Sequence, residues 1–249
     1  MDSSSAHLEE HYTSLGNLKS DFRNKNLYEL ISSCLDKKTL LDIGCGAGHF
    51  LNIAHEKGFQ VSGVEPDQKL IDLSRKLYPG NLNITNCPAE QIDTIRGKFD
   101  NITVIDVLEH VEDDMSVLKK IKGLLAEDGR LIILVPCHPH LYGKRDKAMG
   151  HYRRYSKSNL VDKLEKNGYR ILKLRFWNML GYLPYLISEK VLQREISSSF
   201  RENKSGSPLH NAVSKVLNLW FKYAENAVNF GFGLSLICVV VPRETKEEY

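Results

Sequence analysis

The sequence has 249 residues, and its 34 Lys and Arg against 31 Asp and Glu give a formal net charge of +3, which is too small to indicate nucleic-acid binding. The length allows a substantial buried core, and no apolar run approaches the roughly 18 residues of a membrane-spanning helix. The five cysteines form no C-x-x-C pair, and the first residues lack the basic and apolar regions of a signal peptide. We therefore expect a cytoplasmic protein without a disulfide framework.

Short apolar runs alternate with segments of helical periodicity along the chain. Strands are expected at residues 39–43, 60–65, 82–85, 99–105, 130–135, 169–175 and 234–241. Helices are expected at residues 17–35, 49–57, 66–77, 113–125 and 157–167. The run at 130–135 is almost entirely apolar, as a strand buried on both faces is. Strands separated by helices indicate βαβ units, so we predict an α/β fold with a doubly wound, mostly parallel sheet.

The first expected strand runs directly into a glycine-rich turn, Asp42-Ile-Gly-Cys-Gly-Ala-Gly48. Glycine lets the backbone approach a ligand closely, and the helix that follows presents free N–H groups, so we expect a nucleotide-like ligand here. His49 stands where the dinucleotide fingerprint has its third glycine, which disfavours an NAD-dependent oxidoreductase. Glu65 ends the second expected strand about twenty residues after Gly44, the spacing from which an acid binds ribose hydroxyls.

The fourth expected strand is followed by Asp106-Val-Leu-Glu-His110. Asp106 is expected at the carboxyl edge of the sheet, where ligands bind in doubly wound folds. His110 is the first candidate for a general base, because an imidazole titrates near neutrality. The alternative is that Glu109 and His110 only fix the start of a helix.

The loop after the fifth expected strand contains His138 and the block Gly150-His-Tyr-Arg-Arg-Tyr155. Such a loop lies over the carboxyl edge of the sheet, and guanidinium groups bind phosphates, carboxylates or sugars through paired hydrogen bonds. We therefore predict a catalytic contribution from His151 and acceptor contacts from His138, Tyr152, Arg153 and Arg154. The alternative is that Ser156 caps the next helix and the arginines face water.

Together these motifs resemble the class I S-adenosylmethionine (SAM) methyltransferases, in particular small-molecule O-methyltransferases that carry Leu-Glu-His after the fourth strand. The resemblance covers about residues 35–175 and the last strand. It implies a Rossmann-like sheet of seven strands with one antiparallel strand, SAM as cofactor and S-adenosylhomocysteine (SAH) as product. The cofactor contacts that it implies are Asp42, Gly44, Cys45, Gly46, Gly48, Glu65, Pro66, Ala89, Glu90, Ile105 and Asp106.

The resemblance implies methyl transfer to a hydroxyl of a small-molecule, sugar or lipid-linked acceptor, with Glu109, His110 and His151 as the catalytic residues. N-methylation of a small amine and a non-catalytic SAM-binding subunit are the alternatives. Quinone-pathway O-methyltransferases with Glu-x-x-Glu-His imply a further alternative, Mg²⁺ held by Asp106, Glu109 and His110. We expect no metal, because two carboxylates supply too little oxygen for Mg²⁺ and histidine is not its preferred ligand.

Roughly 55 residues separate the last two expected strands, far more than a tight hairpin needs. Their aromatic content, which begins with Phe176 and Trp177, predicts two helical pieces that form a lid over the acceptor or pack against a second subunit in a homodimer. A lid would favour an apolar or lipid-linked acceptor and peripheral contact with a membrane, and Trp177 would then touch the acceptor. Plain core packing is the alternative. The expected single domain at 1–249 comprises an N-terminal helical segment at 1–36, a core at 37–175, a lid at 176–230 and the final strand at 231–243.

Overall fold

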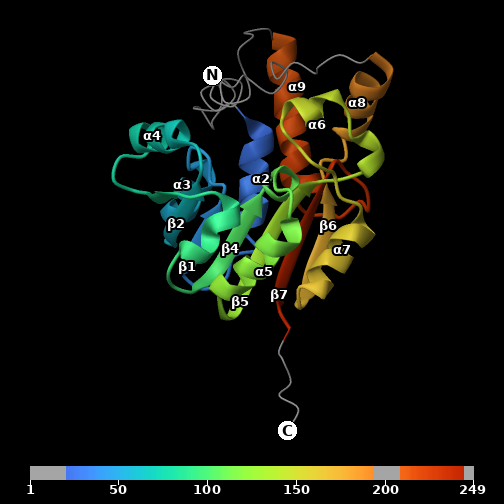
Figure 1. The fold of residues 1–249 in the computed structure, drawn as a ribbon. Coiled ribbons are helices and arrows are strands. Elements are labelled where there is room, and N and C mark those ends of the chain that lie inside the picture. The colour runs from blue at the N-terminus through green and yellow to red at the C-terminus, as the bar shows by residue number, and fades with distance from the viewer. Residues whose placement is uncertain (1–20, 193–207, 244–249) are drawn as a thin grey trace.

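A computed structural model describes residues 21–192 and 208–243, and its seven strands form one sheet in the order β3-β2-β1-β4-β5-β7-β6 (Figure 1). Strand β7 runs antiparallel to both of its neighbours, and the other neighbouring strands are parallel. The strands are β1 Thr39–Ile43, β2 Gln60–Glu65, β3 Asn83–Asn86, β4 Phe99–Ile105, β5 Leu125–Pro136, β6 Tyr169–Trp177 and β7 Ser235–Pro242. The predicted Rossmann-like sheet is confirmed.

The helices follow the predicted order, and many begin at a side chain suited to cap them. The described α-helices are α2 Phe22–Ser32, α3 His49–Glu56, α4 Gln68–Leu77, α5 Asp114–Leu124, α6 Lys144–Ala148, α7 Lys157–Lys166, α8 Tyr182–Leu186 and α9 Pro208–Leu219. Short 3₁₀ helices are η1 Ala89–Thr94, η2 Leu108–His110 and η3 Pro139–Leu141. Asp21, Asp67, Asp113 and Ser156 each accept a hydrogen bond from a backbone N–H in the first turn of the helix that they precede.

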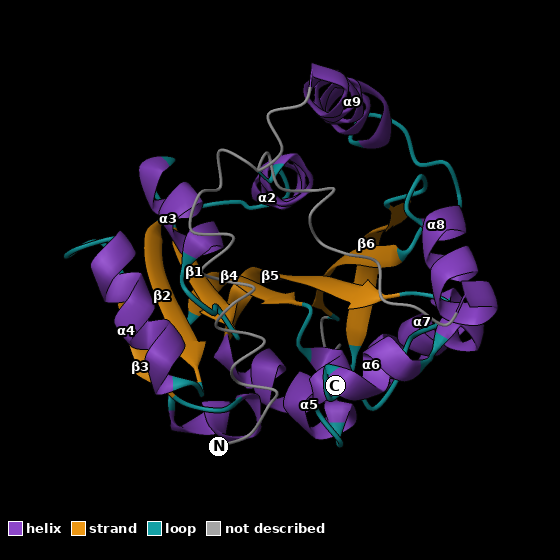
Figure 2. Cartoon of the chain, turned by 90° about the horizontal axis from the view of Figure 1, so that it is seen from above, coloured by secondary structure: helices purple, strands orange, loops and turns teal. Residues whose placement is uncertain are grey.

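Two apolar cores lie on opposite faces of the sheet. Alternate residues of β5 enter different cores: Leu131 and Ile133 face one, and Ile132 and Leu134 face the other. Helices α2 and α3 cover one face, and α5 and α7 cover the other (Figure 2). This two-sided burial explains why β5 is apolar almost throughout. No helix in the described ranges is long and apolar enough to cross a membrane.

Strand β5 begins earlier than predicted. Leu125, directly after α5, pairs with Phe99, and the next pairing joins Arg130 to Asn101 across an irregularity in the register. Residues 126–129, Ala-Glu-Asp-Gly, form this bulge and carry no apolar alternation, so the sequence pattern indicated the strand only from Arg130 onward.

The segment between β6 and β7 contains two helical pieces, which confirms the predicted helical insertion. Helix α8 continues as a π-helix at Ile187–Leu192, and α9 continues as one at Trp220–Glu225. Helix α9 lies outside α2 (Figure 2), where Asn26 Nδ2 donates to Asn218 Oδ1 at 2.8 Å. Helix α8 instead contacts α6, because the Tyr185 hydroxyl donates to Asp146 at 3.2 Å.

The order of the strands places a topological switch point between β1 and β4. From β1 the chain builds the sheet toward β2 and β3, and from β4 it builds toward β5 on the other side. Ligands of doubly wound sheets bind in the crevice outside the carboxyl ends of the strands at such a point. The segments after β1 and β4 therefore define where the functional site is to be sought.

Candidate functional site

The glycine turn after β1 is shaped by its packing as well as by its openness to a ligand. Gly44 and Gly48 have φ of +70° and +78°, which glycine adopts readily. A Cβ on Gly44 would collide with the Val107 side chain, and one on Gly48 would collide with Leu82. The backbone N–H groups of Gly44 and Cys45 both donate to the carbonyl of Val64, at 2.8 and 3.1 Å. The turn is thus fixed against β2 and against the segment that follows β4.

Two buried acids support this turn. Asp42 accepts a hydrogen bond from the Thr103 hydroxyl at 2.6 Å, which joins β1 to β4, and burial raises the pKa of Asp42 to about 7. Glu65 accepts hydrogen bonds from the N–H groups of Gly46 and Asp67 at 2.8 and 3.0 Å. Burial raises the pKa of Glu65 as well. Both acids lie where the cofactor prediction needs them, at the carboxyl ends of β1 and β2.

The other predicted cofactor residues follow the neighbouring strands. Pro66 is exposed after β2, and the amide of Asn86, at the end of β3, donates to its carbonyl at 2.9 Å. In η1, Ala89 is buried and Glu90 is exposed. Ile105 ends β4. These residues share the carboxyl edge of four adjacent strands, and their roles as cofactor contacts stay predictions.

Asp106 adopts a backbone conformation that is uncommon outside glycine. Its φ is +52°, and its N–H donates to the carbonyl of Leu134 at 3.0 Å. Such strained residues cluster at functional sites. Burial raises the pKa of the Asp106 carboxyl, and the positive charges of Arg23, in α2, and of Arg154 oppose that rise.

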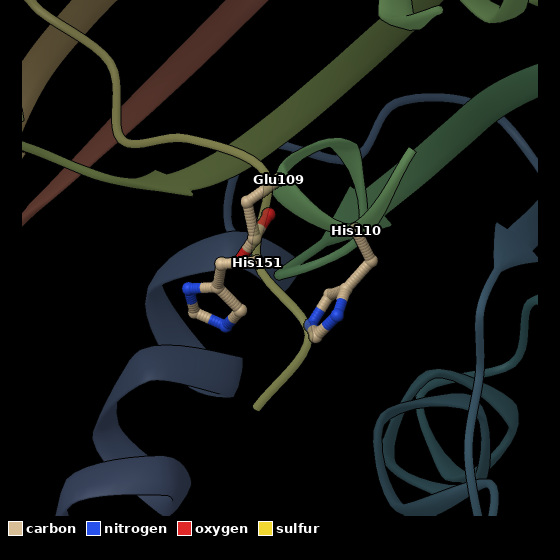
Figure 3. Close-up of side chains that lie close together, drawn as sticks. All are labelled: Glu109, His110 and His151. Carbon is tan, nitrogen blue, oxygen red and sulfur yellow. The ribbon is translucent and has the colours of Figure 1, made fainter. Parts of the chain in front are cut away.

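Three side chains converge directly after β4. Single ligand atoms of Glu109, His110 and His151 all lie within 4.8 Å of one another, and Figure 3 shows the two imidazole rings beside the Glu109 carboxyl. The ring centroids of His110 and His151 are 4.5 Å apart. Burial and the neighbouring His151 lower the pKa of His110 to about 4, so this imidazole is neutral near pH 7. Burial and the charge of Asp106 hold the pKa of the Glu109 carboxyl well above its usual range.

Backbone and side-chain hydrogen bonds bring the distant His151 to this position. The N–H of Tyr152 donates to the carbonyl of Glu109 at 2.7 Å, and the Tyr155 hydroxyl donates to that of Leu108 at 3.1 Å. Tyr155 also exchanges backbone hydrogen bonds with the end of β5, through its N–H to Pro136 and its carbonyl from His138. The block 150–155 therefore lies along the ends of both β4 and β5.

Asp146, in α6, orients the His151 ring. Its Oδ1 lies 3.0 Å from His151 Nδ1, and Nε of Arg154 donates to both of its oxygens at 2.8 and 3.0 Å. Although burial opposes ionisation, hydrogen bonds from His151 and Arg154 lower the pKa of Asp146 to about 2. The Asp146 carboxylate accepts this hydrogen bond, so His151 Nδ1 is the donor and Nε2 is the ring nitrogen that Asp146 does not use. That Nε2 and Oε2 of Glu109 are buried and have no hydrogen-bond partner in the described structure.

Comparison with known proteins identifies the fold and the family. Residues 17–174 match the family described as a methyltransferase domain. The chain belongs to this family. It is also 32% identical over 109 residues to the ubiquinone biosynthesis O-methyltransferase of Actinobacillus pleuropneumoniae serotype 7, in an alignment that covers 38% of this chain and 44% of that protein. The chain thus spans less than half the length of that relative.

Solved structures of methyltransferases share the fold at low sequence identity. A TehB-like SAM-dependent methyltransferase from Corynebacterium glutamicum has a TM-score of 0.58 and 17% identity, covering 96% of this chain and 100% of that one. The plantazolicin methyltransferase BamL, solved with SAH and a triazolic desmethylPZN analogue, has a TM-score of 0.59 and 14% identity, in an alignment that covers 97% of this chain and 90% of that one. Family membership and fold together confirm the expectation of a SAM-dependent methyltransferase.

The two arginines predicted to bind the acceptor are engaged within the protein. Arg154 is buried against Asp146, and it also donates to the Cys137 carbonyl at 3.1 Å and to the Tyr185 hydroxyl at 2.5 Å. Arg153 pairs with Asp114 at 3.0 Å. Their acceptor contacts stay predictions that these interactions do not support.

The remaining predicted acceptor residues differ in exposure. Tyr152 is 54% exposed, with the Arg153 guanidinium over its ring, whereas Trp177 is fully buried and packs at a tilt against Phe221 in the core. His138 has a φ of +66°, and its Nε2 lies 2.9 Å from the Gly233 carbonyl oxygen. Of these three, Tyr152 has the surroundings that best suit an acceptor contact.

Proposed function

We propose that this methyltransferase transfers a methyl group from SAM to a hydroxyl of a small-molecule acceptor, a class that includes sugar and lipid-linked alcohols. The supporting observation is the buried group of Glu109, His110 and His151 after β4, next to the strand that ends in the glycine turn. A hydroxyl becomes a strong nucleophile when it loses its proton, and these side chains offer lone pairs at that place. The O-methyltransferase relative supports the same type of reaction by its name.

The residues around the turn suit SAM. Bound SAM supplies an electrophilic methyl group on a positively charged sulfur. The bare backbone of Gly44, Gly46 and Gly48 lets a ligand approach closely, and Glu65 stands at the end of β2, where an acid accepts hydrogen bonds from ribose hydroxyls. Asp42 holds the turn in place through Thr103. Positioning the nucleophile in line with the methyl group would account for much of the rate enhancement.

The buried group also favours a hydroxyl over an amine as the acceptor. A neutral amine attacks with its own lone pair and need not lose a proton first. Buried polar atoms without partners are costly, and a role in binding or catalysis is one explanation for their presence. Neither N-methylation nor a non-catalytic SAM-binding subunit explains why Glu109 Oε2 and His151 Nε2 are buried without a hydrogen-bond partner in the described residues.

We propose further that α8 contributes to a lid over the acceptor. Tyr185 of α8 contacts Asp146 and Arg154, so this helix is joined to the residues that orient His151. The part of the insertion that includes α9 packs on α2 instead. Of the two helices that the structure describes in the insertion, α8 is therefore the one placed to respond to an acceptor at the cluster.

A panel of acceptors tests the function. The full chain is incubated with SAM and with catechols, phenols, sugar alcohols, a lipid alcohol and primary amines, and SAH formation is measured. We expect SAH with at least one hydroxyl class and a loss of 100-fold or more in kcat/KM for Glu109→Gln, at an unchanged affinity for SAH. The exposed His55→Ala serves as the control. SAH formation with amines alone, or none although SAH binds, would refute the proposal.

A further inference from the structure

We propose that Glu109, His110 and His151 form a binding site for a divalent first-row transition metal ion of the Zn²⁺ and Co²⁺ class. Metal binding itself does not depend on the proposed function. The role that we assign to the ion, binding and acidifying the acceptor hydroxyl, does rest on it.

The geometry comes close to that of a three-ligand site. One carboxylate oxygen and two imidazole nitrogens lie within 4.8 Å of one another (Figure 3). Around Zn²⁺, with bonds of about 2.0–2.1 Å in a tetrahedral arrangement, ligand atoms lie about 3.3 Å apart. Side-chain rotations that bring the atoms roughly 1.5 Å closer would complete the site.

Two of the three ligand residues each have a buried atom without a hydrogen-bond partner. The Glu109 residue is 1% exposed and the His151 side chain is 7% exposed. Glu109 Oε2 and His151 Nε2 are both without a hydrogen bond in the described residues. A metal ion between them would satisfy both atoms at once.

The residues behind His151 suit a metal ligand. Metal-binding histidines usually donate their second N–H to a carboxylate or a carbonyl, which fixes the tautomer and the ring orientation. Asp146 supplies that carboxylate at 3.0 Å from Nδ1, and Arg154 holds Asp146 in turn. This leaves Nε2, which is buried and has no hydrogen-bond partner among the described residues, as the nitrogen available to a metal ion.

The sequence led us to expect no metal, and the alternative that the motif implied was Mg²⁺ held by Asp106, Glu109 and His110. The group that the structure brings together has His151 in place of Asp106, and it selects another kind of metal. Two imidazoles and one carboxylate suit Zn²⁺, Co²⁺ or Fe²⁺ rather than Mg²⁺, which prefers oxygen ligands and water.

Three protein ligands leave a coordination position for the acceptor oxygen. Binding there would lower the pKa of the hydroxyl, whose proton leaves to solvent. The new O–CH₃ bond forms as the S–CH₃ bond of SAM breaks, and the bonding pair stays on sulfur, giving neutral SAH. No oxidant or reductant is consumed.

Metal titration of the full chain tests the site. After exhaustive chelation and removal of the chelator, the protein is titrated with Co²⁺ and followed by visible d–d absorption, and Zn²⁺ binding is measured by competition with a chromogenic chelator. We expect one equivalent bound, intense tetrahedral or five-coordinate Co²⁺ bands, and no displacement by a large excess of Mg²⁺. Glu109→Gln and His151→Ala should weaken binding 100-fold or more.

Asp146→Asn and His55→Ala are the matched variants. Asp146→Asn leaves all three ligands but removes the carboxylate behind His151, and we expect 10- to 100-fold weaker binding. His55→Ala removes an exposed histidine of α3 and should bind as the native chain does. SAH binding, measured in each sample, reports whether a variant is folded.

Metal binding and methyl transfer are read separately, so the two proposals can fail separately. Less than a tenth of an equivalent bound, or equal affinity in folded Glu109→Gln, overturns the metal site. Hydroxyl methylation that continues unchanged after chelation overturns the role of the ion but leaves the proposed function intact. One equivalent of Co²⁺ bound without methylation of any hydroxyl refutes the proposed function instead.

Discussion

Asp42 and Glu65 hold the glycine turn through hydrogen bonds that a carboxyl group can make in two protonation states. Asp42 faces the Thr103 hydroxyl, while Glu65 faces the N–H groups of Gly46 and Asp67. Burial raises the pKa of both acids, most clearly that of Asp42, which reaches about 7. The stability of the turn is therefore tied to pH.

We expect Asp42→Asn to flatten the pH dependence of stability. The folded chain keeps the Asp42 proton up to about pH 7, whereas the unfolded chain releases it near its ordinary pKa of 3.8. Native stability should therefore fall as pH rises from about 4 to 7, by up to ~4 kcal/mol from this group. Urea unfolding at several pH values measures this fall, and Asp72→Asn, on exposed α4, is the control. If the free energy of unfolding of Asp42→Asn fell with pH as steeply as that of the native chain, the expectation would be wrong.

The second residue-scale prediction concerns cofactor affinity. Glu65→Ala should weaken SAH binding by about 10- to 100-fold, because charged hydrogen bonds to ribose contribute about 1.5–3 kcal/mol each. Isothermal titration gives the affinity, and Glu56→Ala, exposed at the end of α3, should bind normally. Unchanged binding by Glu65→Ala would remove this residue from the cofactor site.

At the scale of elements, one network joins α6, α8 and the block 150–155. Arg154 donates to Asp146 and to the Tyr185 hydroxyl, and that hydroxyl donates to Asp146. Asp146 in turn orients His151. The insertion between β6 and β7 therefore reaches the cluster through the side chain of Tyr185.

We expect Tyr185→Phe to destabilise the fold by about 1–3 kcal/mol, because Arg154 and Asp146 each lose a buried partner while the ring still packs. Tyr182→Phe is the matched control in the same helix, since its hydroxyl makes an exposed contact with His140 at 3.1 Å. Chemical denaturation of both variants gives the comparison. Equal losses in the two variants would show that the network adds nothing beyond ordinary packing.

The sequence predicted best those strands that have a clear turn signal directly at their ends. Strands β1, β2 and β4 begin and end where expected. The glycine turn follows β1, Glu65 before Pro66 ends β2, and Asp106 follows β4. The β5 bulge at 126–129 has no such signal. Turn and cap chemistry is local, and single residues suffice to reveal it.

The candidate site was only partly predictable for the same reason. Glu109 and His110 follow a strand directly, and the sheet topology alone places them. Asp146 and Tyr185 reach His151 through tertiary contacts across loops, and no spacing in the sequence indicates those pairs. Arg154 was a candidate acceptor contact because its chemistry is visible in the sequence, whereas its buried partner is not.

At the scale of the whole molecule, the switch point brings two separate segments together. The turn after β1 and the cluster after β4 come from adjacent strands, although more than fifty residues of chain lie between them. The close approach of Gly44 to Val107 fixes the distance between the turn and the cluster, because any larger residue at position 44 would collide with Val107. A cofactor on the turn and an acceptor at the cluster would therefore meet at a fixed distance.

The same architecture binds dinucleotides such as NAD in other families. In this chain, His49 is the residue that favours SAM over a dinucleotide. The His49 imidazole is buried at the start of α3, with Nδ1 at 2.6 Å from the Tyr78 hydroxyl. It occupies the place where a dinucleotide fold needs glycine for close helix–strand packing and for the pyrophosphate. The turn should therefore accept SAM or SAH and exclude NAD.

Thermal unfolding with ligands tests this exclusion on the intact molecule. A ligand at 100 times its Kd stabilises the fold by about 2.7 kcal/mol, which raises Tm by about 5–11 °C in a chain of this size. We expect that rise with SAH and with SAM, and none with NAD at the same concentration. Glu65→Ala should reduce the shift at a fixed SAH concentration, because weaker binding lowers the ratio of ligand to Kd. A comparable rise with NAD would show that His49 does not decide which nucleotide the switch point accepts.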